Sequence, residues 1–136
     1  MTALYWLALT ATMTALFWLP YVLNRVFAIG LGGTLGNPRP EGAAALAPWA
    51  QRARAAHANA VENLTLFAAL VLIAYAKGLD TQAPVLIAAQ SYFWARLAHY
   101  LVYTAGVPGA RTIAFTVGFI AQMTVAFVVL SHMTGA

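Results

Sequence analysis

The sequence predicts an all-α integral membrane protein, a four-helix bundle with four transmembrane helices in each chain. Of the 136 residues, 62% are hydrophobic and only 7% are charged, compared with about 25% in soluble domains. The chain also contains four apolar stretches that reach the roughly 20 residues a helix needs to cross the hydrocarbon core. They cover residues 3–29, 48–77, 82–105 and 110–132. Because these stretches use nearly the whole chain, we expect a single transmembrane domain over residues 1–136 and no separate soluble domain.

The first span runs from Ala3 to Ile29. No Lys or Arg precedes its apolar run, so we expect a retained helix rather than a secretory signal. Pro20 lies inside this span and is expected to kink the helix. We expect the helix to end near Asn24 and Arg25. The glycine- and proline-rich stretch that follows, residues 30–42, is predicted to be a loop, and it lacks the lysine and glycine spacing of a phosphate-binding loop.

The other three spans have clearer boundaries. Pro48 is favoured in a first helical turn, and Lys77 followed by Gly78 is typical of a helix end. The third span is expected to end at Gly106. The fourth follows the short "GVPG" turn and carries no charged side chain over residues 112–131.

Basic residues are unevenly distributed among the connections. The second connection offers only Lys77 beside Asp80, whereas five arginines lie at or near the first and third connections: Arg25, Arg39, Arg52, Arg54 and Arg111. By the positive-inside rule, the first and third connections are cytoplasmic and both termini lie outside. We attribute the net charge of +4 to membrane orientation and expect no nucleic-acid partner.

Ionisable side chains also lie within the second and third spans. Placing such groups at bilayer depth costs about 2.5 kcal/mol or more, so they usually face the bundle interior and indicate a functional site. Asn59 and Glu62 are three residues apart on one helix face. Four residues of the third span form a single stripe at i, i+4, i+7 and i+11: Tyr92, Arg96, His99 and Tyr103. We expect the two sets to face each other.

These residues allow two interpretations, a structural ion pair or a ligand-binding site, which require different numbers of arginines. A buried Glu62–Arg96 ion pair would serve only helix packing. The surplus of arginines over Glu62 instead favours a site for an anion, because a guanidinium binds carboxylates bidentately and keeps its charge when desolvated. The chain has no cysteine, so any thiol chemistry must come from a bound ligand, and we expect no metal.

The ordered set of motifs resembles the MAPEG family, the membrane-associated proteins in eicosanoid and glutathione metabolism. The resemblance covers nearly the whole chain and includes "RAAHANAVEN" at residues 54–63 and "RLAHYLVYTAGVPGAR" at residues 96–111. Each motif alone is weak, but their order on four spans is specific. The residues that carry the resemblance are Asn59-x-x-Glu62, Arg96-x-x-His99-x-x-x-Tyr103 and Arg111.

The resemblance implies a bacterial-type member that forms a homotrimer in the inner membrane, with glutathione as the thiol co-substrate between neighbouring subunits. It implies a glutathione S-transferase or peroxidase that acts on lipophilic electrophiles or lipid hydroperoxides. Arg111 would be the catalytic residue, because a cation near the sulfur favours the nucleophilic thiolate. The implied glutathione ligands are Arg25, Arg54, Asn59, Glu62, Arg96, His99 and Tyr103.

The chain departs from the family pattern four residues before Asn59. Well-studied members carry an arginine at that position, and this chain carries Ala55, with Arg52 and Arg54 nearby. One alternative is therefore a noncatalytic trimer that binds an anionic lipid or metabolite in the same basic cleft. A proton or ion conduit is another alternative, but the chain shows no inverted repeat and has one intramembrane carboxylate.

Overall fold

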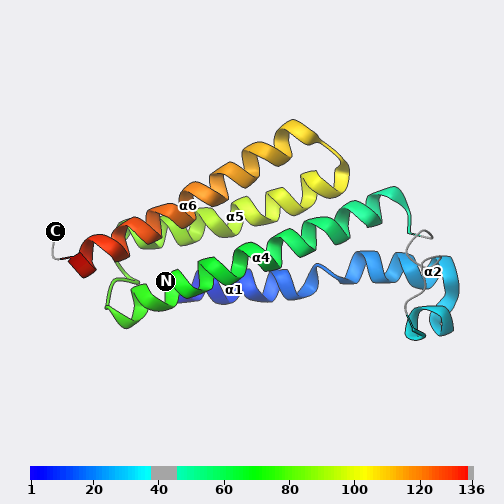
Figure 1. Ribbon diagram of the computed structural model, residues 1–136, viewed down its shortest axis with the longest axis horizontal. Helices are drawn as coiled ribbons and strands as arrows, with labels where there is room; N and C mark the ends of the chain where they lie inside the picture. Colours follow the sequence, from blue (N-terminus) through cyan, green and yellow to red (C-terminus); the bar gives the residue numbers. More distant parts are fainter. Residues whose placement is uncertain (38–45, 135–136) are drawn as a thin grey trace.

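The computed structural model describes residues 1–37 and 46–134. In these residues the secondary structure is α-helical with turns between the helices, which confirms the all-α prediction. The helices are α1 (Ala3–Leu16), α2 (Leu19–Leu35), α4 (Pro48–Ala76), α5 (Ala83–Ala105) and α6 (Pro108–Thr134). Helices α1 and α2 follow each other along the long axis of the molecule, α4 runs beside both of them, α5 packs against α1 and α4, and α6 pairs with α5 (Figure 1).

The first span is broken between α1 and α2, as the proline predicts. Phe17 and Trp18 form a turn, and Pro20 lies in the first turn of α2. The hydroxyl of Tyr100 on α5 donates a 2.9 Å hydrogen bond to the carbonyl of Phe17. The two rings stack with centroids 3.8 Å apart. Helix α5 therefore satisfies a backbone acceptor at the break and holds the break in place.

The prediction that the first helix ends near Asn24 and Arg25 is wrong. Helix α2 continues to Leu35, with an internal kink at Gly30, whose φ is 74°. Part of the glycine-rich stretch that was predicted as loop is therefore helical. Asn24 accepts a 3.0 Å hydrogen bond from the backbone N–H of Ala47, so it joins α2 to the start of α4. Arg39, counted among the cytoplasmic arginines, lies outside the described residues.

The remaining helix bounds lie within two residues of those expected. Helix α4 ends at Ala76 rather than Lys77, α5 begins at Ala83 rather than Gln82, and α6 covers Pro108–Thr134 rather than residues 110–132. The sequence signals used for these boundaries, a first-turn proline and a terminal glycine, act locally and hold in the folded chain.

Both ends of the described chain lie beside the α4–α5 turn. The N–H of Ala3 donates to the carbonyl of Asp80 at 2.9 Å, and the side chains of Gln82 and His132 are 3.5 Å apart. The α5–α6 turn and the end of α2 lie at the opposite end of the bundle (Figure 1). Four consecutive crossings of a membrane would produce this arrangement.

Three helical segments of the described chain are long and apolar enough to cross a membrane: Ala3–Leu35, Pro48–Ala76 and Pro108–Thr134. Helix α5 is not among them. Its 23 residues would extend about 34 Å, which exceeds a hydrocarbon core of about 30 Å. Its mean hydropathy is lowered by polar residues such as Arg96 and His99, which are the residues that the site uses.

The apolar core has two parts. The larger part joins α1, α4, α5 and α6, and includes Phe67 and Tyr92 with rings stacked 3.7 Å apart. The smaller part lies around the α1–α2 break and includes Phe17, Ala56 and Tyr100. On α5, the segment between Tyr92 and Tyr100 therefore connects two apolar clusters, and it carries the polar residues of the candidate site.

Candidate functional site

Arg96 is at the centre of the candidate site. Its side chain is only 1% exposed, and its Nη1 donates a 3.3 Å hydrogen bond to Oδ1 of Asn59. The guanidinium carbon lies 5.0 Å from the ring centroid of Tyr92 and 5.2 Å from that of Phe115, distances at which aromatic rings stabilise a cation. The polar residues of α4 and α5 meet at this hydrogen bond.

Gly118 allows α6 to approach Arg96 closely. A Cβ atom on Gly118 would lie 3.2 Å from Nε and 3.3 Å from Nη2 of Arg96, closer than ordinary van der Waals contact. The absence of a side chain at this position is therefore what lets the guanidinium pack against the α6 backbone.

A row of polar and aromatic side chains continues from Arg96 toward the α5–α6 turn. The ring of His99, which is 3% exposed, lies 5.5 Å from that of Tyr103 and 6.0 Å from that of Phe115. The guanidinium carbon of Arg111 lies 4.6 Å from the ring centroid of Tyr103. Seven residues separate Arg96 from Tyr103, a rise of about 10 Å. The row therefore has a cation at each end.

Arg52 is a site residue whose contacts the sequence did not predict. Its Nε donates a 3.0 Å hydrogen bond to the carbonyl of Thr104, near the end of α5. Its guanidinium also lies against Gly106, where a Cβ would be 3.1 Å from Cζ and Nε. Arg52 thus joins α4 to the turn before Arg111. The spacing in the sequence could have indicated this role, because Arg52 precedes Asn59 by seven residues and so shares its helix face.

Glu62 and Arg54 lie outside this row, and both side chains are exposed. The Glu62–Arg96 ion pair is not formed within the chain, since Arg96 is buried against Asn59. Arg54 borders a shallow hollow of about 360 Å³ together with Ala55 and neighbouring residues. Ala55, where the family pattern has an arginine, is exposed as well.

Arg25 also lies apart from the row. It is half-buried on α2, and its Nε has no hydrogen-bond partner among the described residues. His57, close to Asn59 in sequence, lies at a hydrogen-bonding distance of 2.9 Å from the hydroxyl of Tyr21 and packs edge-on against Phe17. His57 therefore links α4 to α2. Of the eight expected site residues, the structure brings five together: Asn59, Arg96, His99, Tyr103 and Arg111.

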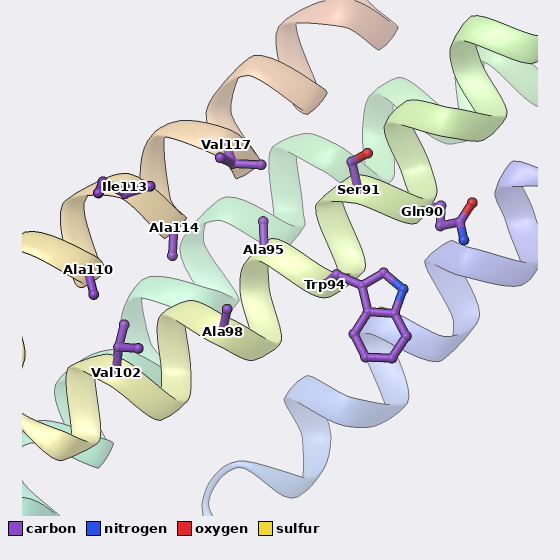
Figure 2. A pocket seen from close by; sticks show the side chains of 10 residues that line it. All are labelled: Gln90, Ser91, Trp94, Ala95, Ala98, Val102, Ala110, Ile113, Ala114 and Val117. Carbon is purple, nitrogen blue, oxygen red and sulfur yellow. The ribbon is translucent and has the colours of Figure 1, made fainter.

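An apolar groove lies between α5 and α6 on another face of this hairpin. Its volume is about 690 Å³, and its lining includes Trp94, Ala98 and Val117. Figure 2 shows the small side chains of both helices along its floor. A second hollow of about 430 Å³ continues along the same two helices and shares Ser91 and Val117 with the first. The groove suits an apolar chain, whereas the row of Arg96 and Arg111 suits an anion.

Comparison with known protein families identifies the family of the chain. The model of the MAPEG family matches residues 2–131, which is nearly the whole chain and includes every residue of the row. No curated protein sequence matches the chain. With its membrane-length helices and a family match of this extent, the chain is an integral membrane protein that belongs to the MAPEG family.

Proposed function

We propose that the protein binds glutathione and uses its thiol in a transferase or peroxidase reaction on lipophilic electrophiles or lipid hydroperoxides. The observation that carries this proposal is the row from the buried Arg96 to the half-buried Arg111, with a cation at each end, in a MAPEG chain. Arg96 would bind a carboxylate of the tripeptide, and Asn59 would orient it. Arg111, about 10 Å farther along, would face the thiol.

The role of Arg111 follows from electrostatics. A cation beside a thiol favours its ionised form, and the thiolate is the nucleophile in both conjugation and peroxide reduction. The chain has no cysteine of its own, so the nucleophile would be the bound tripeptide. His99 and Tyr103 lie between the two arginines and would contact its middle.

We further propose that a homotrimer completes the site. Glu62 and Arg54 are exposed on α4. In a trimer, these two side chains of one subunit would lie against the row of the neighbouring subunit. Glu62 would then bind the ammonium group of glutathione. In the membrane, the four helical segments would cross the bilayer of the bacterial inner membrane, with the first and third connections cytoplasmic and both termini outside. The row would thus open near the cytoplasmic face.

A lipophilic substrate would reach the thiol from the bilayer. The apolar groove of Figure 2 ends at Val102 and Ala110, which are the sequence neighbours of Tyr103 and Arg111. An apolar chain in this groove would therefore have one end close to the proposed position of the thiol.

A second function, noncatalytic binding of an anionic lipid or metabolite, is favoured by one observation. The position where the family pattern has an arginine is Ala55, and it is exposed, so the exposed face of α4 holds one cation fewer than the pattern would supply. Binding of an anion would not require the missing residue.

Turnover by the detergent-purified protein distinguishes the two functions. With glutathione and either an aryl halide or a lipid hydroperoxide, we expect Arg111→Ala to lower turnover about tenfold or more, as the loss of one unit of thiol pKa depression would produce. Lys77→Ala removes an exposed cation that directly follows α4, at the end of the bundle opposite Arg111. It should leave turnover unchanged. Equal rates for wild type and Arg111→Ala would refute the enzyme, and thermal stabilisation by anionic lipid but not by glutathione would support the second function.

A further inference from the structure

Three buried side chains between α5 and α6 carry polar atoms with no hydrogen-bond partner among the described residues. The atoms are Nε and Nη2 of Arg96, the hydroxyl of Tyr92 and Oε1 of Gln122. The side chains are 1%, 0% and 5% exposed, respectively. An unpaired buried polar group costs about 1–3 kcal/mol, and more when it is charged. Buried polar groups are therefore nearly always paired with protein or ordered water.

These atoms belong to side chains on neighbouring turns of the packed helices α5 and α6, which we call one layer of the bundle. Tyr92 and Arg96 are four residues apart on α5, and Gly118 and Gln122 are four residues apart on α6, so each pair lies on one helix face. Arg96 packs against Gly118. Because α5 and α6 form an antiparallel hairpin (Figure 1), residues before Arg96 on α5 face residues after Gly118 on α6, so Tyr92 and Gln122 lie on the same side of this contact.

The guanidinium of Arg96 has one edge with a hydrogen-bond partner and one edge without a partner among the described residues. Nη1 bonds Asn59 on α4, whereas Nε and Nη2 face α6, where Gly118 exposes the backbone. The second edge offers two donors. Gln122 offers an acceptor and Tyr92 offers a hydroxyl that can donate or accept. Water complements this set, since it can accept from the guanidinium and donate to the amide oxygen.

We propose that this layer is a hydration site in which buried water links Arg96 to Tyr92 and Gln122. Ordered water of this kind usually makes about three hydrogen bonds to buried polar groups, which this layer supplies. Tyr92 and Gln122 are then positioning residues, because they hold the α6-facing edge of the guanidinium and so direct Nη1 toward Asn59. This last step rests on the proposed glutathione site, whereas the hydration site itself does not.

Thermal unfolding of the full-length protein tests the hydration site without any ligand. If the polar atoms were merely unpaired, Tyr92→Phe and Gln122→Leu would remove a penalty and raise the melting temperature. With bridging water, each should lower it by about 3 °C or more. The double variant should lose less than the sum of the two, because both side chains share one network. Tyr75→Phe and Gln90→Leu change exposed residues on α4 and α5 and serve as matched controls.

Three results would overturn the hydration site. The first is a melting temperature that rises or stays constant in Tyr92→Phe, which removes a single oxygen atom and should fold. The second is strict additivity in the double variant. The third is a melting temperature that depends on chloride when gluconate replaces it at constant ionic strength, because a bound anion would then occupy the layer.

Glutathione affinity tests the positioning role separately. We expect Tyr92→Phe and Gln122→Leu to weaken glutathione affinity about fivefold, seen as a higher KM with little change in kcat. Unchanged affinity together with coupled melting would refute the positioning role and keep the hydration site. Failure of the wild-type protein to bind glutathione would refute the proposed function and the positioning role, while the melting experiment would still decide the hydration site.

Discussion

Arg96 determines which residues can surround it. A guanidinium inside a membrane-spanning bundle requires hydrogen-bond partners and favourable electrostatics on every side. Asn59 provides an acceptor from α4, and the rings of Tyr92 and Phe115 provide aromatic faces. Gly118 provides the space. The space at Gly118 depends on a missing side chain, so a single methyl group at this position would remove it.

Gly118→Ala should displace the guanidinium, because the new Cβ would lie 3.2 Å from Nε. We expect the melting temperature to be about 2–4 °C below that of Gly109→Ala and glutathione affinity to fall about fivefold. Gly109 is the matched control, since it also lies on α6 and a Cβ there would meet nothing within 4 Å. Equal melting temperatures and equal affinities for the two variants would contradict this role of Gly118.

Residue type and spacing predicted the centre of the site but not its surroundings. Asn59, Arg96 and His99 stand out because polar groups are costly in apolar helices, and periodicity places Arg96 and His99 on one face. The contact of Gly118 with Arg96 depends on the register between α5 and α6, which no local pattern encodes. The exposure of Glu62 also could not be predicted, because spacing fixes a face of α4 but not its neighbour.

At the level of elements, the α5–α6 turn is held by a contact from a third helix. Gly106 ends α5 in the left-handed region, with φ 81°, and Arg52 of α4 packs against it. The turn precedes Arg111, so its geometry decides where that guanidinium lies. Through this contact an arginine distant in sequence reaches the candidate site.

Gly106→Ala should be more destabilising than Gly78→Ala. Both glycines have positive φ, 81° and 70°, so each substitution should cost about 1–2 kcal/mol of backbone strain. Only at Gly106 would the Cβ also contact Arg52, at 3.1 Å. Melting temperatures should show the difference, which should disappear when Arg52→Ala is combined with each variant. A difference that persists without Arg52 would contradict this explanation.

Proline and glycine residues predicted the helix boundaries well where a single residue determines the backbone conformation of the boundary. Pro48, Pro20 and Gly106 act through their own backbone, and the helices begin, break and end beside them. The first helix was predicted too short, because Asn24 and Arg25 were interpreted as its end. A polar residue at a membrane boundary does not break helical hydrogen bonds, and the side chain of Asn24 instead bonds Ala47.

At the level of the whole molecule, composition was sufficient to predict a membrane bundle. It was not sufficient to establish the number of crossings, because α5, which carries polar residues of the candidate site, is not among the segments that are long and apolar enough to cross a membrane. The oligomeric state is also not encoded in any pattern of a single chain, since it depends on contacts between exposed faces.

The absence of cysteine makes the topology directly testable. Thr81→Cys places a thiol in the α4–α5 turn, and Val107→Cys places one in the α5–α6 turn; both positions are exposed. We expect a membrane-impermeant maleimide to label the first variant in intact cells and the second only after permeabilisation. Labelling of both from the same side would show that α5 does not cross the membrane.

The antiparallel pairing of α5 with α6 has a consequence for how such a protein can diversify. Each inserted residue in the turn would rotate α6 by about 100° and shift it by about 1.5 Å, moving Arg111 away from Tyr103. The same movement would take Gly118 and Phe115 away from Arg96, and so disturb the guanidinium that bonds Asn59. The length of one turn therefore sets both ends of the row together, so evolution or a protein engineer could not change it without altering the proposed anion-binding and reactive ends at once.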